Sequence, residues 1–284
     1  MPELPEVEII RRSLEQRLMN RRIMDTEILL SRQIKWPDIG NFVALVAGRT
    51  FVKFERRGKY LLFSFDNGNM LVFHLRMTGR LCYMEANTLP DPYARIIFHL
   101  AGGDALVYAD TRTLGALYAL RPGELWRLHG LSEMGPEPLS AEFTPAYLQQ
   151  VLQGRKTRIK SFLLNQKYIG GLGNIYADET LFLAKIHPLR LAGSLSMPEI
   201  VRLHEAANAV IQAGIADGGT TFRDYRDGNG HKGHHQESLQ VYHRTGKACT
   251  RCGTCIERIV VGGRSTHFCP QCQPLLPERC NRKT

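Results

Sequence analysis

The sequence lacks long hydrophobic runs. No apolar stretch in its 284 residues approaches the roughly 18 residues that a membrane-spanning helix needs. The first residues include Glu3, Glu6 and Glu8, whereas a secretory signal peptide has basic and then apolar residues there. These absences argue against a membrane protein and against export. We therefore expect a cytoplasmic protein, or a nuclear one if the cell has a nucleus.

Internal repeats and low-complexity tracts are also absent, and acidic residues are in the minority. The chain has 27 Asp and Glu against 37 Lys and Arg, which gives a formal net charge of +10. A surplus of this size indicates a polyanionic partner, of which nucleic acid is the commonest, or an anionic membrane surface. Because 43% of the residues are hydrophobic, the chain is expected to fold, and its length predicts two domains of ordinary size.

Cysteines are few, and a reducing compartment disfavours disulfides. Four of the seven form two Cys-x-x-Cys pairs separated by sixteen residues, namely Cys249 with Cys252 and Cys269 with Cys272. Four thiolates at this spacing predict a closed tetrahedral zinc site, which is structural rather than catalytic. The remaining cysteines are expected to be ordinary thiols: Cys82, Cys255 and Cys280.

The apolar pattern predicts an α+β protein. A helix is expected after Pro5, because apolar residues recur at helical spacing at Val7, Ile10, Leu14 and Leu18. Residues 23–120 have short strand patterns joined by turns such as Asp66-Asn67-Gly68 and Ala101-Gly102-Gly103-Asp104. We predict a β-sandwich with the first helix packed on it.

After the proline-rich break at residues 135–140 the pattern becomes helical. Helices are predicted at roughly 144–153, 157–165, 174–185 and 197–217, with Asn174 as an N-cap. Residues 218–236 contain five glycines and no apolar periodicity, which predicts a mobile loop. The segment SLQVYHR, residues 238–244, is predicted to be a strand that leads into the cysteine module.

Between the two cysteine pairs, the segment IERIVVGGRSTHF alternates as a hairpin does, with its turn at Gly262-Gly263 and Arg264 beside it. Residues 244–284 contain eight Lys and Arg and two Glu, a local charge of +6. A zinc-stapled basic hairpin is suited to nucleic-acid phosphate. Upstream, GGLGNIYADE places backbone N–H groups at a helix start, which is a candidate anion site.

The opening residues MPELPEVE have two interpretations. Locally they are a helix lead-in, because Pro5 and the acids suit the first turn. If Met1 is removed, however, Pro2 becomes a secondary amine in the α-amino pKa range, able to attack an electrophilic carbon such as a sugar C1. Glu3 could then move protons, and Glu6 could hold the amine.

Five motifs in order, MPELPEVE, FHLRMTGRL, MGPEPLS, GGLGNIYADE and GRSTHFCPQC, span nearly the whole chain. With the zinc hairpin they resemble formamidopyrimidine-DNA glycosylases, bacterial enzymes that excise 8-oxoguanine and ring-opened purines from DNA. The resemblance implies a bifunctional glycosylase and AP lyase of base excision repair. It also implies a monomer with one structural Zn²⁺, acting on oxidised double-stranded DNA in the bacterial nucleoid.

The resemblance further implies three regions. They are a catalytic β-sandwich domain at 1–135, a helix-two-turn-helix domain with a lesion-capping loop at 136–240, and a zinc-finger hairpin with a basic tail at 241–284. Within the loop, residues 220–225 are expected to close over the extruded base.

The same resemblance assigns site residues. Pro2 is expected to be the nucleophile, Glu3 the general acid and base, and Glu6 their support. Lys59, also placed with the catalytic residues, and Lys160 are expected at phosphate near the lesion. The expected backbone clamps are His74, Asn174, Tyr242 and Arg264, of which Arg264 is also placed with the catalytic residues.

Met77, Arg112 and Leu114 are expected to fill the gap left by the extruded nucleotide, with Arg112 facing the orphaned cytosine. Leu114 stands where the family commonly has Phe. Two alternatives stay open: the same chemistry on oxidised pyrimidines, as in endonuclease VIII-type enzymes, and a non-catalytic zinc-dependent DNA-binding protein. Leu4 favours the purine branch, since the pyrimidine branch tends to open Pro-Glu-Gly-Pro.

Overall fold

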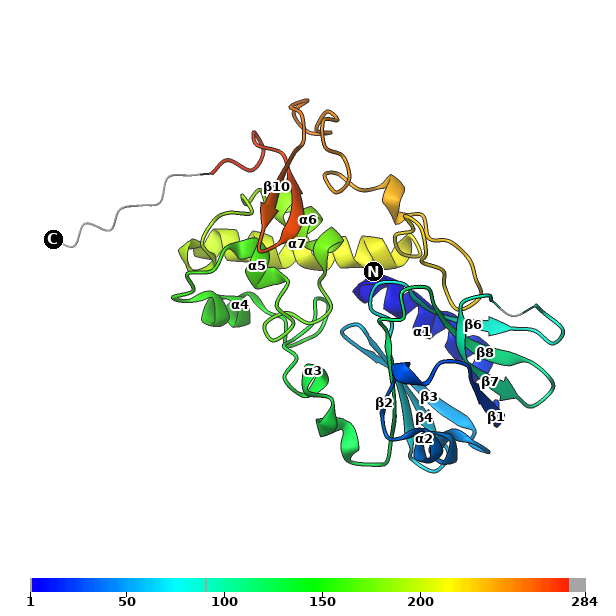
Figure 1. The fold of residues 1–284 in the computed structure, drawn as a ribbon. Coiled ribbons are helices and arrows are strands. Elements are labelled where there is room, and N and C mark those ends of the chain that lie inside the picture. The colour runs from blue at the N-terminus through cyan, green and yellow to red at the C-terminus, as the bar shows by residue number, and fades with distance from the viewer. Residues whose placement is uncertain (1, 90, 276–284) are drawn as a thin grey trace. The chain divides into compact units, whose positions relative to one another are not determined.

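The computed structural model describes residues 2–89 and 91–275, which form two compact units (Figure 1). The first unit comprises the chain up to Met134 together with Ala213–Glu237. The second comprises Gly135–Gln212 and the chain from Ser238 onward. The glycine-rich loop thus belongs to the N-terminal unit, although the sequence places it beside the helical region. Cys280 and the basic tail lie outside the described residues.

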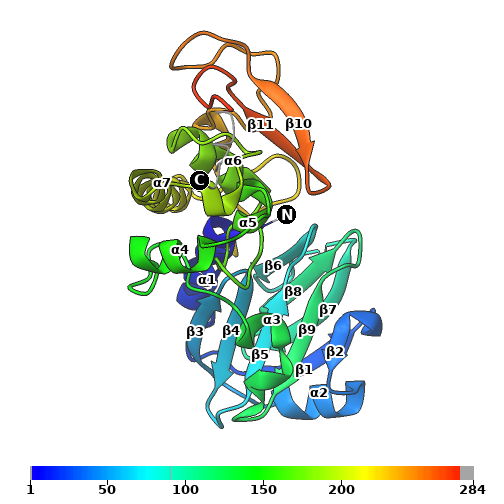
Figure 2. The ribbon, with the colours of Figure 1, turned by 90° about the vertical axis from the view of Figure 1, so that its left-hand side faces the viewer.

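The first unit contains two sheets. In the described residues, one sheet has the strand order β2-β9-β5-β4-β3 and the other the order β1-β7-β8-β6. Figure 2 shows β3, β4 and β5 side by side in the first of them. The strands are β1 (Ile23–Ile28), β2 (Ile34–Trp36), β3 (Phe51–Arg57), β4 (Tyr60–Phe65), β5 (Met70–His74), β6 (Gly79–Met84), β7 (Ala94–Leu100), β8 (Ala105–Asp110) and β9 (Ala116–Leu120).

The two sheets share one core, so the predicted sandwich is confirmed. The ring of Phe73 on β5 lies 6.2 Å from that of Phe98 on β7, which joins the inner faces of the two sheets. Both rings are fully buried. The predicted hairpins are also present, because β4 pairs with β5 across the Asn-Gly turn and β7 pairs with β8. At that first turn Gly68 has a φ of +80°, which glycine adopts without strain.

Helix α1 (Leu4–Leu18) closes the core of the sandwich. The four apolar residues predicted to form its buried stripe are all buried: Val7, Ile10, Leu14 and Leu18. The first unit also contains η1 (Ser31–Gln33), α2 (Ile39–Val46), η2 (Glu124–Arg127), α3 (His129–Ser132) and η4 (His235–Glu237).

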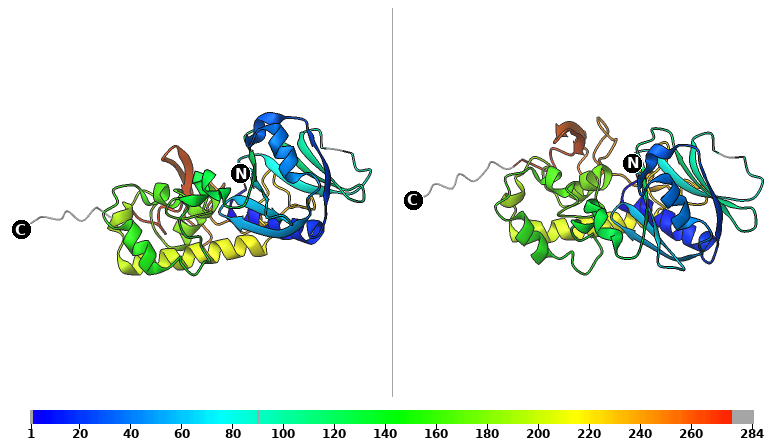
Figure 3. Two further views of the ribbon diagram at one scale, coloured as in Figure 1. Left: turned by 90° about the horizontal axis from the view of Figure 1, so that it is seen from below. Right: turned by 60° about the horizontal axis from the view of Figure 1, so that its bottom comes forward.

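The second unit is helical and carries a two-stranded hairpin. Its elements are α4 (Pro145–Leu152), α5 (Ile159–Leu163), α6 (Asn174–Leu183), η3 (Ala192–Ser194), α7 (Met197–Ala216, whose last residues belong to the first unit), β10 (Glu257–Val261) and β11 (Arg264–Phe268). All four predicted helices and the predicted hairpin are present. Figure 3 shows the hairpin standing out from the helices of this unit. No helix of the described residues is long and apolar enough to cross a membrane.

The strand predicted at residues 238–244 does not form. Leu239 and Val241 are buried, as the alternation predicted. The backbone N–H groups of Gln240, Val241 and Tyr242, however, all donate to the carboxylate of Glu179, at 2.8–2.9 Å. Three consecutive donors that converge on one side chain cannot also point alternately to two neighbouring strands.

A second prediction was wrong at the start of α6. Gly173, not Asn174, is the N-cap residue, and Asn174 is the first residue of the helix. Its side-chain amide donates to the carbonyl oxygen of Ser265 at 2.9 Å. Asn174 therefore ties α6 to the hairpin instead of capping its own helix.

Helix α1 is joined to β3 through the Glu8 carboxylate, which accepts hydrogen bonds from Arg11, Arg12 and Arg56. Burial alone would raise the pKa of Glu8, but these three guanidinium groups outweigh it and lower the pKa from 4.5 to about 2. A carboxyl whose pKa falls on folding stabilises the native state above its unfolded pKa. That stabilisation is lost as the pH falls from about 4.5 towards 2.

We therefore predict that Glu8→Gln lowers the free energy of unfolding by about 2 kcal/mol at pH 7. The difference between the two proteins should shrink steadily below pH 4.5 as the wild-type carboxyl takes up its proton. Urea unfolding of both proteins between pH 7 and pH 3 measures it. A difference that stays constant over this range would show that the ion pairs of Glu8 do not stabilise the fold.

Candidate active site and nucleic-acid interface

Pro2 and Glu3 lie immediately before helix α1 and are buried, with Glu3 2% exposed. Glu3 is the N-cap residue of α1, and its backbone N–H donates to Oε2 of Glu6 at 2.8 Å. Because a rigid helix follows directly, the two residues are held in one place rather than frayed. The segment therefore has the fixed geometry that a reacting group needs.

Glu6 also holds the glycine-rich loop. Its Oε1 accepts a hydrogen bond from the backbone N–H of Thr220 at 2.7 Å, and the side chain is 1% exposed. Sequence reasoning expected Glu6 to hold the terminal amine. In the structure its two carboxylate oxygens bind the N–H groups of Glu3 and Thr220. One buried carboxylate thus links the start of α1 to the start of the loop.

The loop is packed tightly at this point. Gly219 has a φ of +84°, and an added Cβ would lie 3.0 Å from the Tyr225 ring and 3.1 Å from Cγ of Glu6. The Tyr225 hydroxyl lies 3.2 Å from the carbonyl oxygen of Gly218, and burial raises the pKa of this phenol. Only glycine satisfies both the backbone angle and the space at position 219.

The far end of the loop is attached to the sandwich. The Gly228 N–H donates to Oγ of Ser13 at 2.9 Å, and its carbonyl oxygen accepts from the Tyr83 N–H at 2.8 Å. A Cβ on Gly228 would lie 2.5 Å from Leu14. Residues 221–227 are therefore held at both ends, by Glu6 on one side and by α1 and β6 on the other.

Lys59 and His74 lie at the same end of the five-stranded sheet. Lys59 is in the turn between β3 and β4 and is 8% exposed, and His74 ends β5 with its ring 4.4 Å from that of Tyr60. Burial, with the charges of Arg76 and Lys59, lowers the pKa of His74 to about 3, so the ring is neutral at pH 7. Its Nδ1 accepts from the Arg76 N–H at 3.2 Å, which leaves the proton on Nε2 as a donor.

The three predicted plug residues are exposed on two adjacent loops of the first unit. Met77 is 37% exposed in the loop that joins β5 to β6. Arg112 and Leu114 are exposed in the loop that joins β8 to β9, with Leu114 at 47%. The two loops are in contact, because the backbone N–H of Arg112 in the second donates to the Thr78 hydroxyl of the first at 3.2 Å.

In the second unit, Lys160 of α5 is fully enclosed and forms an ion pair with Asp178 of α6, which is 1% exposed. The other carboxylate oxygen of Asp178 accepts from the backbone N–H of His267 on β11 at 2.9 Å. Sequence reasoning expected Lys160 at a DNA phosphate. The structure instead places its ammonium group beneath the surface, where it fixes α5, α6 and the hairpin to one another.

The hairpin presents Arg264 at its tip, exposed beside the Gly262-Gly263 turn. The turn sits against α5, since a Cβ on Gly262 would lie 2.6 Å from Oγ of Ser161. Asn174 holds the next residue of the hairpin, Ser265, by its carbonyl oxygen. Tyr242 lies close by, with its ring 4.9 Å from that of His267. Four of the predicted DNA-binding residues thus lie on α6, on the hairpin or in contact with α6: Lys160, Asn174, Tyr242 and Arg264.

The four predicted zinc ligands come together. The Sγ atoms of Cys249, Cys252, Cys269 and Cys272 all lie within 4.8 Å of one another, with Cys249 to Cys272 at 3.9 Å and Cys252 to Cys269 at 3.5 Å. A tetrahedral Zn²⁺ with Zn–S bonds of about 2.3 Å needs sulfur atoms about 3.8 Å apart. Backbone N–H groups of Arg251 and Cys272 point at two of the sulfurs. The residues present thus fit one structural zinc ion.

Three buried acids were missed by sequence reasoning: Asp110, Asp178 and Glu179. Each binds backbone N–H groups of a segment that carries predicted DNA-binding residues. The sequence did contain a sign that two of them are buried, because Asp178 and Glu179 lie within the otherwise largely apolar helix NIYADETLFL. Acids within such a helix are buried only when they find partners.

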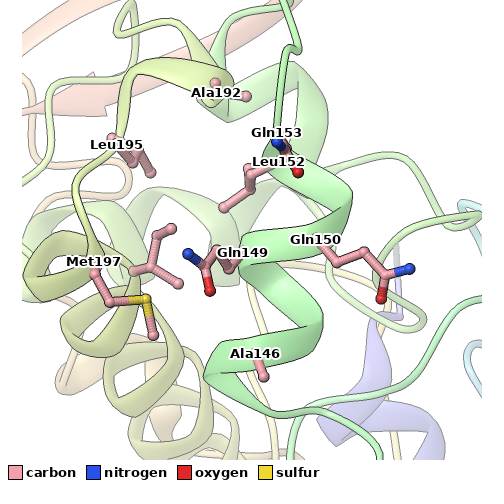
Figure 4. Close-up of a pocket in the computed structure, with 10 residues that line it drawn as sticks. Ala146, Gln149, Gln150, Leu152, Gln153, Ala192, Leu195 and Met197 are labelled. Carbon is pink, nitrogen blue, oxygen red and sulfur yellow. The ribbon is translucent and has the colours of Figure 1, made fainter.

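The second unit also contains a pocket of about 500 Å³ between α4 and the start of α7. In Figure 4 Gln149, Leu195 and Met197 point towards its centre. The residues that line it include three glutamines but no acid, base or nucleophile. This pocket therefore offers no groups for the chemistry considered above.

Comparisons with known proteins cover the same three regions. Residues 1–117 match the formamidopyrimidine-DNA glycosylase N-terminal domain, residues 134–226 the H2TH domain of that family, and residues 246–275 a zinc finger found in FPG and IleRS. The formamidopyrimidine-DNA glycosylase of Symbiobacterium thermophilum is 50% identical over 276 residues, which cover 97% of this chain and 90% of that protein.

Two solved structures are similar in fold. A Lactococcus lactis FPG mutant in complex with DNA containing Fapy-dG has a TM-score of 0.91 and 35% identity, covering 96% of this chain and 100% of the other. The MutM (FPG) protein of Thermus thermophilus has a TM-score of 0.88 and 38% identity, covering 97% and 100%. The predicted α+β fold, with its helical domain and zinc finger, is confirmed by these similarities.

Proposed function

Since the chain belongs to the formamidopyrimidine-DNA glycosylase family, we propose that it excises oxidised purines from duplex DNA through a Schiff base on Pro2 and then cuts the strand. The protein is a DNA glycosylase and AP lyase of base excision repair. The observation that carries the proposed mechanism is the fixed, buried position of Pro2 and Glu3 at the start of α1.

In this mechanism, processing that leaves Pro2 first in the chain exposes a secondary amine. Its α-amino pKa, about 8, leaves a useful unprotonated fraction at neutral pH. The nitrogen lone pair bonds to the sugar C1′ as the glycosidic bond breaks, and the electron pair of that bond leaves with the base, which takes up a proton. Glu3, next in the chain, is suited to carry protons to the departing base and to the sugar ring oxygen.

Loss of the amine proton and opening of the sugar ring give an iminium, which stays cationic because the nitrogen has no further proton to lose. That charge acidifies C2′. Removal of a C2′ proton expels the 3′ phosphate, and a second elimination expels the 5′ phosphate. Water then hydrolyses the iminium and releases Pro2. Strand cleavage thus follows from the same nitrogen that removes the base.

The base must leave the duplex for this attack to occur, because C1′ of a stacked nucleotide is hidden. We propose that Met77, Arg112 and Leu114 fill the resulting gap, which lowers the cost of unstacking. Leu114 supplies apolar bulk but no aromatic face. Residues 220–225 close over the extruded base, starting from the Thr220 that Glu6 holds.

Phosphate contacts come from both units. In the first, Lys59 supplies positive charge, and neutral His74 supplies an Nε2–H donor. In the second, exposed Arg264 reaches the backbone, with Asn174 and Tyr242 beside it. The ammonium group of Lys160 lies beneath this surface, paired with Asp178. There it keeps α5, α6 and the hairpin in the positions from which the exposed groups reach the phosphates. The zinc ion, bound by Cys249, Cys252, Cys269 and Cys272, holds the hairpin that carries Arg264 and takes no part in the chemistry.

The substrate class is tested by comparing excision from duplexes that contain 8-oxoguanine, a formamidopyrimidine or thymine glycol. Release of the two purine lesions should be faster than release of thymine glycol by at least about tenfold, an order typical of pocket discrimination. A faster reaction on thymine glycol would assign the chain to oxidised pyrimidines instead.

We further propose that the protein acts as a monomer in the cytoplasm, where the bacterial nucleoid lies.

Arg264→Ala should weaken binding to lesion-containing duplex and reduce the salt dependence of binding by about one unit of slope. The reason is that a single exposed guanidinium at the hairpin tip releases about one counterion on neutralising a phosphate. Titrations at several salt concentrations measure the slope. Arg258→Ala is a matched control, because Arg258 lies on the same hairpin but bonds Ser265 within it. An unchanged slope in Arg264→Ala would argue against a phosphate contact.

A further inference from the structure

The two loops that carry the plug residues share one buried carboxylate, that of Asp110 at the end of β8. We propose that Asp110 is the positioning residue of the duplex plug. It fixes the backbone of Arg112 and the neighbouring loop of Met77, and so sets how strictly the protein reads the base opposite the lesion. This inference rests on the proposed function.

Asp110 holds both ends of the Arg112 loop. Its Oδ1 accepts from the backbone N–H of Arg112 at 3.1 Å, and its Oδ2 accepts from the backbone N–H of Gly115 at 2.9 Å. The Asp110 side chain is 0% exposed, so these bonds do not compete with water. Arg112, Thr113 and Leu114 are therefore the residues that the two anchors enclose.

The Met77 loop is attached to the same group through Thr78. The Thr78 hydroxyl donates to Oδ1 of Asp110 at 2.6 Å and accepts from the Arg112 N–H at 3.2 Å. Thr78, Asp110 and Arg112 thus form a closed triangle of hydrogen bonds. A shift of either loop breaks at least one side of the triangle.

The carboxylate is in turn fixed from its other side. Gln33 Nε2 and the Tyr108 hydroxyl donate to Oδ2 at 3.0 and 3.2 Å. The Gly115 backbone approaches this cluster so closely that a Cβ would lie 1.8 Å from the Tyr108 hydroxyl oxygen. Five donors on one buried carboxylate offset its loss of hydration and leave it one position.

The loop also stores backbone strain. Thr113 has a φ of +55°, in the left-handed region, which is unfavourable for a β-branched residue. Such a conformation persists where neighbouring contacts over-determine it, and here the N–H bonds on either side of Thr113 do so. Without Asp110 the strained residue would relax, and Arg112 and Leu114 would change direction.

Arginine recognises a base through two parallel hydrogen bonds from its guanidinium group to the base edge. These bonds form only when the guanidinium group is held in one orientation relative to the base. Arg112 itself would remain after loss of Asp110, but its guanidinium would sample several positions. Contacts to a preferred opposite base should weaken more than contacts to a disfavoured one. The measurable consequence is a smaller ratio of excision rates between two opposite bases.

The test compares wild type with Asp110→Asn, Thr78→Val and a control, Gln33→Met. Asn keeps the shape of Asp, but in either orientation its Nδ2 donor faces a backbone N–H of the loop, that of Arg112 or that of Gly115. Val removes only the Thr78 hydroxyl. Gln33→Met removes one hydrogen bond to the same carboxylate, but Gln33 belongs to neither loop. Excision of 8-oxoguanine opposite cytosine and opposite adenine is measured for each. Amide hydrogen exchange at Arg112 and Gly115 is measured without DNA.

The ratio of excision opposite cytosine to excision opposite adenine should fall by about tenfold in Asp110→Asn, the scale of one lost bidentate base contact. It should fall by a smaller factor in Thr78→Val. It should stay within about twofold of wild type in Gln33→Met, because the other four donors, which include the bonds to both loops, still hold the carboxylate. Exchange at the two amides should accelerate in Asp110→Asn. If Asp110→Asn does not fold, the proposal is tested by comparing the cytosine-to-adenine excision ratio of Thr78→Val with that of Gln33→Met, and it requires a lower ratio in Thr78→Val.

An unchanged ratio in Thr78→Val and Asp110→Asn would overturn the proposal, even if both proteins lost overall activity, since a purely structural role predicts that outcome. Slow exchange at both amides in Asp110→Asn would overturn it independently of any enzyme assay. Failure of the proposed function is distinguishable, because wild type itself would then release no 8-oxoguanine, and the exchange data would still decide the positioning role.

Discussion

A protein with one extra residue between Met1 and Pro2 should lose excision of 8-oxoguanine while it still binds lesion-containing duplex. The extra residue converts the Pro2 nitrogen into an amide, whose lone pair is delocalised and cannot attack C1′. We expect the excision rate to fall by at least about 10⁴, since nucleophilic attack by this nitrogen starts every later step. Single-turnover excision and equilibrium binding measure the two properties separately.

The buried position of Pro2 and Glu3 makes a folding control necessary. Thermal unfolding should show that helix α1 is intact, and an extra residue at the other end of the chain provides a matched protein with a free Pro2. Excision within about tenfold of wild type from the extended protein would contradict the assignment of Pro2 as nucleophile.

Cys269→Ser should remove zinc and reduce affinity for lesion-containing duplex by at least about 10², through loss of the hairpin that presents Arg264. Cys269 is fully buried in a small core with Phe182, Val241 and Ile256, which the metal completes. Structural zinc contributes on the order of 10 kcal/mol to folding of such modules, so the hairpin should unfold without it. The sandwich has its own core and should stay folded.

Cys255→Ser is the matched control, because Cys255 is an exposed cysteine three residues after Cys252 and is not in the four-sulfur cluster. It should retain zinc and binding. Metal content by mass spectrometry and titration of DNA at physiological salt measure the effect. Full affinity in a zinc-free Cys269→Ser protein would refute a role for the metal in presenting the hairpin.

Local signals in the sequence predicted much of this fold. The Asn-Gly turn, the α1 stripe and the Gly262-Gly263 hairpin all formed as expected, since each depends on residues close in the chain. The zinc cluster was predictable for a related reason, because two Cys-x-x-Cys pairs need only one turn between them.

The errors lie where distant partners compete with local preference. Asn174 has the residue type of an N-cap, but Ser265, 91 residues away, takes its side-chain amide. Residues 238–244 alternate as a strand does, and burial followed that alternation, yet Glu179 took the backbone donors. Such bonds cannot be predicted from a local pattern, because neither partner is flanked by residues that indicate the other.

The same reason explains what the sequence missed at the site. Asp110 and Gln33 are 77 residues apart, so nothing near Asp110 indicates that it joins two loops. Likewise Lys160 could be placed at phosphate only by resemblance, and its pairing with Asp178 required the folded chain. The motifs gave the candidate site residues, whereas the structure shows which contacts hold those residues in place.

The most direct test of the central claim is to locate the covalent intermediate. Wild-type protein is mixed with 8-oxoguanine duplex in the presence of borohydride, which reduces an iminium to a stable amine, and the cross-linked peptide is sequenced by mass spectrometry. The account predicts a single adduct on the nitrogen of Pro2, in a protein from which Met1 is absent. An adduct on a lysine such as Lys59, or excision with no adduct, would contradict it.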